Sequence, residues 1–390
     1  MREEMRPDRD APMVRIGLLR LTDAAPVIVA AEKGLFAKRG LDARLSIEPS
    51  WANVADKLTY RQLDAAVMLP PLAIAVSLGI RGAGIPLIVP MSLSLNGNSI
   101  TVAKELAKAV APRAGLSATE IGARLKAYLA ARSNPLRFAV VHVFSTHNLL
   151  LRYWLAASGI DPDKDVEISV VPPAETSEAL KTGRIDGFCA GAPWGEVAAR
   201  VDVGRTIVVS SAIWHNHPEK CFAVSRDWAN ANPTAVAALM DALIEAARFC
   251  DAPANAYEVA GILSGTDYLA LTPDIVRESL PSAEQAIMSH VDRSVFFANA
   301  ATFPWQSHAR WFIEQMARWG LLPANTDRAA ATEIYRPDLY RSAVERSGLP
   351  APLGDAKAEG AHAIAWQVAG RPSDIAMAPD LFCDGKIFAG

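Results

Sequence analysis

Short apolar runs alternate along the first part of the chain with segments of helical character. The runs over residues 14–19, 41–47 and 65–69 are rich in branched or small apolar side chains and predict strands. Residues 26–31 and 54–63, which follow the first two runs, predict helices. Regular alternation of strands and helices is typical of a parallel sheet covered by helices, so we expect an α/β fold.

The alternation returns in the middle of the chain as a loose repeat. Residues 180–188 echo residues 58–66, because in both a helix ends, a turn follows and an apolar–Asp–small step opens a strand. The two steps are Leu63-Asp64-Ala65 and Ile185-Asp186-Gly187. Each strand then runs into a proline and a new helix. The simplest interpretation is two α/β lobes built on the same plan.

The rest of the chain predicts a second lobe and a return to the first. Residues 136–144 predict a strand that leads into a helix over 148–157, and 221–225 predict a strand before a long helix over 233–250. No low-complexity linker separates the lobes, so we expect two crossing segments that form a hinge and a cleft. The expected division is a charged, flexible N-terminus over 1–13, lobe I with a helical C-terminal extension over 14–103 and 212–390, and lobe II over 104–211.

Composition narrows the class of protein. The chain has 390 residues, of which 51% are hydrophobic and 21% charged, which is enough apolar material for a large core. Its 39 basic and 42 acidic side chains leave a net charge of −3. Direct binding to nucleic acid or to an anionic membrane needs a strong basic excess, so we expect neither. A local anion site needs only one or two cations and fits this charge.

The N-terminus and the cysteines bear on the compartment. No apolar stretch of signal-peptide length precedes Val14, and no cysteine lies near the start for lipid attachment, so we expect a cytoplasmic location. The four cysteines are scattered without a CxxC pair, which fits a reducing compartment and disfavours a zinc site. His215 and His217 resemble a metal pair, but no third ligand lies near them. We therefore expect no metal and no cofactor.

Two candidate ligand-binding residues follow predicted strands. His147 lies in the first turn of a helix that Ser145 or Thr146 caps, where free N–H groups favour an anion and the imidazole adds a donor. Gly191 follows a strand, where glycine lets the backbone approach a ligand; a simple turn before a helix explains it equally well.

Three further candidates lie at loops or expected crossings. Lys220 stands just before the strand that returns to lobe I, where an ammonium group can place a charge in a cleft, although exposed lysines are commoner. Trp51 follows a strand and offers a flat wall with one N–H donor. Asn98 lies between two strands that cross the lobes, where its amide can face an anion or form a turn.

The sequence offers little for catalysis. No GxSxG, HExxH, Walker A or GxGxxG motif occurs. An enzyme on the same fold, with Cys189 or His147 as its catalyst, is the alternative from another class of protein. We expect a binding protein rather than an enzyme.

Several motifs in order along residues 14–250 resemble the nitrate/nitrite-binding proteins of bacterial ABC transporters. They look most like the cytoplasmic sensor branch of that family, NasS. The motifs are Leu21-Thr22-Asp23-Ala24-Ala25-Pro26, Ser50-Trp51, Ser145-Thr146-His147-Asn148 with Arg152-Tyr153-Trp154, Gly191-Ala192-Pro193-Trp194 and His217-Pro218-Glu219-Lys220.

The resemblance implies a type II periplasmic-binding-protein fold, with two lobes joined by a two-segment hinge and nitrate or nitrite in the cleft. It implies ligand contacts at Trp51, His147, Gly191 and Lys220. Asn98 stands where the family usually has glutamine, and its shorter amide makes that contact the least secure. Bicarbonate-binding relatives typically lack the lysine that matches Lys220, so its presence favours nitrate or nitrite.

The sensor branch implies regulation. We expect a cytoplasmic nitrate/nitrite sensor that controls an antiterminator protein of the NasT type in nitrate assimilation. The alternative is the substrate-binding component of an ABC transporter for nitrate, bicarbonate or an organic anion. The sequence assigns the C-terminal tail no role beyond covering lobe I.

Overall fold

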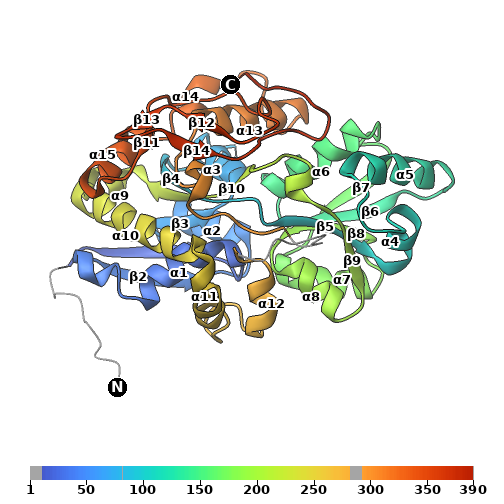
Figure 1. Ribbon diagram of the computed structural model, residues 1–390, viewed down its shortest axis with the longest axis horizontal. Helices are drawn as coiled ribbons and strands as arrows, with labels where there is room; N and C mark the ends of the chain where they lie inside the picture. Colours follow the sequence, from blue (N-terminus) through green and yellow to red (C-terminus); the bar gives the residue numbers. More distant parts are fainter. Residues whose placement is uncertain (1–10, 81, 282–291, 390) are drawn as a thin grey trace.

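Two α/β lobes lie side by side in the computed structural model, which describes residues 11–80, 82–281 and 292–389 (Figure 1). Lobe I is built on a five-stranded sheet in the order β2-β1-β3-β10-β4. Its strands are β1 (Met13–Leu18), β2 (Asp42–Ile47), β3 (Ala65–Met68), β4 (Leu87–Leu95) and β10 (Pro218–Ser225). The expected flexible N-terminus lies, up to residue 10, outside the described residues.

Lobe II is built on a second five-stranded sheet in the order β7-β6-β8-β5-β9. Its strands are β5 (Asn98–Ala103), β6 (Leu136–Val140), β7 (Val166–Val170), β8 (Gly187–Gly191) and β9 (Gly204–Val209). Two α/β lobes, each built on its own sheet and joined by two crossings of the chain, are the arrangement of the type II periplasmic-binding-protein fold. The predicted fold class is therefore confirmed.

Helices cover both sheets and connect their strands. Those of lobe I before the first crossing are α1 (Ala25–Glu32), α2 (Trp51–Thr59) and α3 (Pro70–Ser77). Those of lobe II are α4 (Lys104–Val110), α5 (Ala118–Ala130), α6 (Thr146–Ala157), α7 (Thr176–Lys181) and α8 (Trp194–Arg200). Six short 3-10 helices join them: η1 (Thr22–Ala24), η2 (Ala37–Arg39), η3 (Pro173–Glu175), η4 (Ser210–Ala212), η5 (Pro253–Asn255) and η6 (Ala298–Ala300).

The C-terminal part of the chain is a helical extension followed by short strands. Its helices are α9 (Arg226–Ala231), α10 (Pro233–Asp251), α11 (Ala256–Leu263), α12 (Pro273–Glu278), α13 (Gln306–Arg318), α14 (Arg328–Thr332) and α15 (Pro337–Ser347). Its strands are β11 (Ala351–Pro352), β12 (Trp366–Val368), β13 (Gly370–Arg371) and β14 (Ile375–Met377). Helix α10 packs on α1, and α13 packs on α3. The extension therefore packs on lobe I.

The extension also reaches lobe II. Helix α13 contacts α6, and the Tyr153 hydroxyl of α6 donates a 2.8 Å hydrogen bond to Asp384 in the tail. The Tyr153 ring lies 5.4 Å from the ring of Phe382 and 6.1 Å from that of Trp311. The tail thus links the two lobes on the side away from β2, a role that the sequence did not predict.

The first crossing between the lobes falls earlier than expected. The expected boundary after residue 103 places β5 in lobe I, but β5 pairs with β8 and β9 of lobe II. The chain therefore crosses at Asn96-Gly97, between β4 and β5. It returns between β9 and β10, where the positive φ of Asn216 marks a turn. The expectation of parallel sheets is also only partly right, because β10 and β5 run antiparallel to their neighbours.

The repeat found in the sequence corresponds to one ion pair built twice. In lobe I the Arg15 guanidinium donates to both carboxylate oxygens of Asp64, and the Arg15 backbone N–H donates to the same group at 2.9 Å. In lobe II, Arg137 makes the same three hydrogen bonds to Asp186. Each aspartate precedes the strand that lies next to the arginine's strand, so the pair fixes their relative position in both lobes.

The described residues contain no helix that is both long and apolar enough to cross a lipid bilayer.

Replacing Asp64 by alanine tests the role of this pair. The Arg15 backbone N–H loses its acceptor and the guanidinium loses a bidentate partner. We expect the free energy of unfolding, measured by urea denaturation, to fall by about 1–3 kcal/mol. Glu105→Ala is the control, because it removes an ion pair whose side chains are 68% and 81% exposed, and it should change stability by less than about 0.5 kcal/mol. Equal losses in the two variants would contradict a structural role for the repeat.

Candidate functional site

The predicted ligand-binding residues meet where the two lobes join. Lobe I contributes Trp51 and Lys220, and lobe II contributes Asn98, His147 and Gly191. All of them are buried, and none of their side chains is more than 1% exposed. The lobes contact each other directly beside them, because the Thr22 backbone N–H donates to the Ala192 carbonyl at 3.0 Å. The structure thus brings together residues from five separate parts of the chain; their contact with a ligand stays a prediction.

Lys220 is the centre of the cluster. It lies near one end of β10, an interior strand of the lobe I sheet that pairs with β3 and β4. Its Nζ lies 2.7 Å from Oδ2 of Asp23 and donates a hydrogen bond to Oε1 of Glu219. Burial acts against the charged form, but the two carboxylates hold the pKa of Lys220 above its usual range. The group is therefore an ammonium ion at any physiological pH.

The sequence did not predict the two carboxylates around Lys220. An aspartate shortly before a proline-containing helix is typical of an N-cap, but Ala24 occupies that position of α1 and no side chain caps the helix. Asp23 lies instead in η1, 3% exposed, beside the ammonium group. Glu219 is 0% exposed and was seen only as the neighbour of Lys220 in the sequence. Both residues belong to the motifs that carry the resemblance, which was the available signal.

An irregularity in β10 explains why both Glu219 and Lys220 reach the site. Successive side chains of a regular strand point to opposite faces of the sheet. The pairing of β10 with β4 shifts on both sides of Lys220, as at a β-bulge. The predicted strand over 221–225 also starts too late, because the structure extends it to Pro218. Lys220 thus lies within the strand rather than before it.

His147 enters the cluster from the first turn of α6, as predicted. Ser145 caps this helix, with its hydroxyl accepting from the Asn148 backbone N–H at 3.0 Å. Nε2 of His147 lies 3.5 Å from Oε1 of Glu219, and neither ring nitrogen has a hydrogen-bond partner among the described residues. Burial lowers the pKa of His147 to about 3. The ring is therefore neutral near pH 7, with one donor and one acceptor nitrogen.

Trp51 forms a wall beside the ammonium group. Ser50 caps α2 by accepting from the Asn53 backbone N–H, so Trp51 is the first residue of the helix rather than part of a loop. Nζ of Lys220 lies 5.5 Å from the centre of the Trp51 ring, a cation–π distance. The indole N–H is buried without a described hydrogen-bond partner. It is thus a donor available to a bound anion.

Asn98 and Gly191 lie opposite each other on two neighbouring strands of the lobe II sheet, next to the first crossing. Asn98 opens β5 and pairs with Gly191, the last residue of β8. The Asn98 amide donates to Oε2 of Glu219, and its Oδ1 has no described partner. A Cβ at residue 191 would lie 3.3 Å from Oδ2 of Asp23 and 3.4 Å from Oδ1 of Asn98. Glycine therefore lets the backbone at residue 191 lie close to both side chains, and a larger residue would crowd them.

The metal-ligating and nucleophilic side chains near this cluster have the following surroundings. No group of three or more His, Cys, Asp or Glu among the described residues is placed to hold a metal ion. His217 is buried, and its Nε2 lies 2.6 Å from the hydroxyl of Ser210. Burial raises the pKa of the Cys189 thiol, which is the opposite of what activates a nucleophile. The arrangement is suited to binding.

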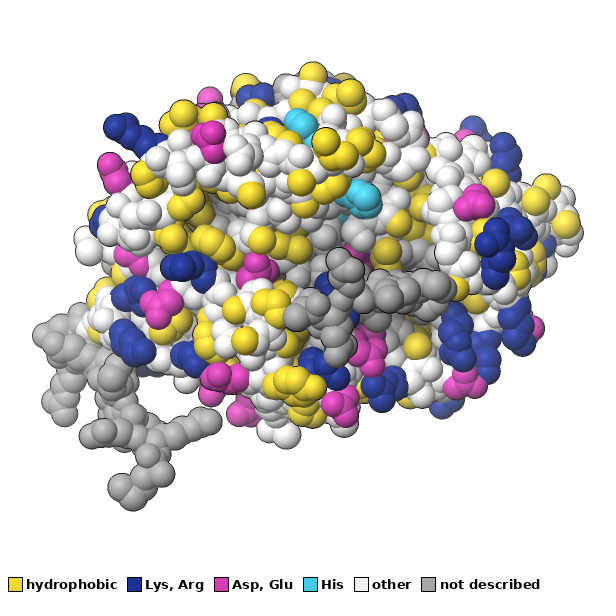
Figure 2. Space-filling view, viewed as in Figure 1, with side chains coloured by type: hydrophobic (Ala, Val, Ile, Leu, Met, Phe, Trp, Pro, Cys, Tyr) yellow, Lys and Arg dark blue, Asp and Glu magenta, His cyan; other side chains and the backbone are white. Residues whose placement is uncertain are grey.

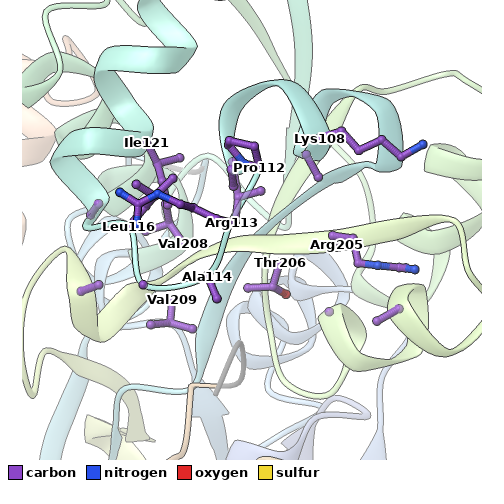
Figure 3. A pocket seen from close by; sticks show the side chains of 18 of the residues that line it. Lys108, Pro112, Arg113, Ala114, Leu116, Ile121, Arg205, Thr206, Val208 and Val209 are labelled. Atoms are coloured by element: carbon purple, nitrogen blue, oxygen red, sulfur yellow. The ribbon is translucent and has the colours of Figure 1, made fainter. Parts of the chain in front are cut away.

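A separate pocket of about 950 Å³ lies on lobe II between the α4–α5 connection, β9 and α8 (Figure 3). None of the predicted ligand-binding residues lines it. Figure 3 shows the Arg113 side chain beside the apolar residues Leu116, Ile121 and Val208, with Lys108 and Arg205 farther along the lining. The buried cluster between the lobes, and not this open pocket, is the candidate site.

The surface agrees with the charge predicted from composition. Figure 2 shows Lys and Arg side chains interspersed with Asp and Glu side chains over much of one face.

Comparison with known proteins places the chain in a family. The family model described as "NMT1-like family" matches residues 8–264. The nitrate/nitrite-binding protein NrtA of Synechococcus elongatus is 34% identical over 356 residues, which cover 87% of this chain and 80% of the relative. The bicarbonate transport ATP-binding protein CmpC of the same species is 36% identical over 86% of this chain. The chain spans about half the length of the ATP-binding relatives that it matches.

A solved structure agrees with these matches. The crystal structure of the periplasmic nitrate-binding protein NrtA from Synechocystis PCC 6803 superposes with a TM-score of 0.83, at 28% sequence identity, over 97% of this chain and 96% of the other. Agreement over almost the whole of both chains includes the C-terminal extension. The protein therefore belongs to the NMT1-like family and to the same family as the nitrate/nitrite-binding protein NrtA.

Proposed function

We propose that the protein is the substrate-binding component of an ABC transporter and binds nitrate or nitrite between its lobes. The observation that carries the proposal is the convergence of residues from both lobes on the buried ammonium group of Lys220. Similarity to NrtA over most of both chains supports the same ligand class. The permease and ATPase of such a transporter are the partners that this function requires.

The chemistry of the site suits a small planar anion. Nitrate and nitrite accept hydrogen bonds and donate none, so a buried site must supply donors to offset the lost hydration. The indole N–H of Trp51, one ring N–H of His147 and the hydroxyl of Thr146 are buried without a described acceptor. Lys220 adds the positive charge, and the Trp51 ring offers a flat surface. Asn98 contributes less directly, because its amide already donates to Glu219.

The relatives favour transport over the sensor function expected from the sequence. The proteins matched above carry transport or anion-binding names. Regulation of an antiterminator of the NasT type and a cytoplasmic location stay predictions. Nitrate-dependent dissociation of such a partner would support the sensor, whereas stimulation of a membrane-bound permease and ATPase would support transport.

Bicarbonate is a second candidate ligand, and one feature of the site favours it. Bicarbonate carries an O–H group that can donate, and Asp23 and Glu219 present carboxylate acceptors beside Lys220. Similarity to CmpC points to the same anion. Nitrate cannot use these acceptors, so the two ligands would make different contacts in one site.

Replacing Lys220 by alanine tests the proposed function. Calorimetric titration of the wild-type protein with nitrate, nitrite and bicarbonate should show binding of nitrate or nitrite. We expect Lys220→Ala to weaken that binding by about 2–5 kcal/mol, because the anion would face two carboxylates without their counter-charge.

Lys104→Ala is the matched control for this experiment. It removes the same charge from the surface of lobe II, where Lys104 pairs with Asp202, and it should leave affinity within about twofold. Circular dichroism should show that both variants are folded. Unchanged affinity in Lys220→Ala would exclude this cluster as the binding site.

Replacing Trp51 by phenylalanine distinguishes the contribution of the aromatic ring from that of the indole N–H donor. The ring remains and the N–H is lost, so we expect affinity for nitrate to fall by about 0.5–1.5 kcal/mol. Trp228→Phe is the control, since Trp228 lies in α9, beyond the opposite end of β10 from Lys220. Identical affinities of Trp51→Phe and wild type would show that the indole N–H does not contact the anion.

A further inference from the structure

The candidate site holds more buried acid than base. Asp23 and Glu219 both contact the single ammonium group of Lys220, and all three side chains are 0–3% exposed. His147 contacts Glu219 as a neutral ring. With these groups in their ordinary states, the centre of the site carries a charge of −1 before any anion enters.

The elements around this centre do not correct the imbalance. Among the residues that the structure describes, the other titratable groups that face it add no further cation: they are the thiols of Cys189 on β8 and Cys221 on β10, the imidazole of His217, which directly precedes β10, and the carboxylate of Asp292. Burial lowers the pKa of His217, which favours its neutral form, and burial raises the pKa values of both thiols. Asp292 is a further acidic residue near this centre, and its carboxylate accepts a hydrogen bond from the Ser210 hydroxyl.

An incoming nitrate would bring the centre to −2 inside a closed, water-poor space. Like charges repel strongly where the dielectric is low, and buried charges without partners are costly. A metal ion could offset the charge elsewhere, but no group of three or more metal-ligating residues among the described ones is placed to hold one. A proton is the remaining small cation.

We propose that nitrate binds to this site together with one proton, and that the Asp23 carboxylate takes that proton. The inference rests on the proposed function and adds a coupled ion to it. The proton comes from solvent and forms an O–H bond on Asp23, so no other reactant is needed. The neutral acid then leaves Lys220 paired with Glu219 alone and offers its O–H to the anion.

The contacts single out Asp23 among the groups that could accept the proton. Glu219 accepts hydrogen bonds from both Lys220 and Asn98, whereas Asp23 has its ion pair with Lys220 and no other described hydrogen-bond donor. Burial and the charge of Glu219 raise the pKa of Asp23, against the effect of Lys220. Although burial opposes it, the charge of Lys220 lowers the pKa of Glu219. The Asp23 carboxyl also lies close to Gly191 of lobe II, because a Cβ there would lie 3.3 Å from its Oδ2.

The coupling fixes the direction of the pH dependence. A proton that binds with the anion makes binding tighter at low pH and weaker as pH rises. Between the pKa of Asp23 in the free protein and its higher pKa in the nitrate complex, each unit of pH should weaken nitrate binding about tenfold, which is the linkage slope for one proton. Bicarbonate brings its own hydrogen and should take up less than one proton from solvent.

Calorimetry at pH 8 in two buffers of different ionisation enthalpy, HEPES and Tris, measures the proton uptake directly. For wild-type protein with nitrate we expect uptake of about one proton. Asp23→Asn copies the shape of the neutral acid, so we expect uptake close to zero, affinity at least as tight as wild type, and a dissociation constant that stays level from pH 7 to 9. Asp56→Asn, an exposed change of the same charge on α2, is the control and should behave as wild type.

Each outcome decides between the proposals. No binding of nitrate at any pH would remove the proposed function. Tight binding without proton uptake, or binding that needs an added divalent cation, would overturn the coupling and leave the function intact. Uptake of a full proton by folded Asp23→Asn would overturn the assignment to Asp23. If Asp23→Asn does not fold, Glu219→Gln makes the same test of the coupling, because it removes one of the two negative charges.

Discussion

The site depends on one buried ammonium group held between two carboxylates. Lys220 has no exposed surface, so its charge can persist there only because Asp23 and Glu219 surround it. Asp23 comes from the first β–α connection of the chain, Glu219 and Lys220 from the strand that returns from lobe II, and Asn98 and His147 contact Glu219 from lobe II. The same charges that hold the two lobes in place therefore also define what can bind between them.

This arrangement differs from a simple anion pocket. A lone lysine would neutralise a monovalent anion by itself, but here the lysine is already compensated. Selectivity must then come from donors without partners, such as the Trp51 indole, and from how the surplus negative charge is relieved. Anions that carry a hydrogen and anions that carry none would relieve it differently. The relatives of this chain include proteins named for nitrate and for bicarbonate.

Much of the fold was predictable from local patterns. Strand–helix alternation and the echo around Asp64 and Asp186 predicted two lobes of one plan, and the structure shows the same Arg–Asp pair in both. The residues around the ligand space were predicted by resemblance, from motifs that are far apart in the sequence. The prediction that β5 belongs to lobe I was wrong, because the hydrophobic pattern of a strand does not show which sheet it joins. That choice depends on pairing with β8 and β9, which lie about 90 residues or more along the chain.

The two missed carboxylates show where local reasoning ends. Asp23 before a proline-containing helix reads as a cap, and only the return of β10 gives it a different partner. Glu219 should point away from Lys220 in a regular strand, and only the shift in β10 pairing brings both to one side. A crystal structure with nitrate tests the central claim most directly. It should show a nitrate oxygen within about 3 Å of Nζ of Lys220, enclosed by both lobes. Nitrate bound only in the open pocket of lobe II, or not at all, would contradict the account.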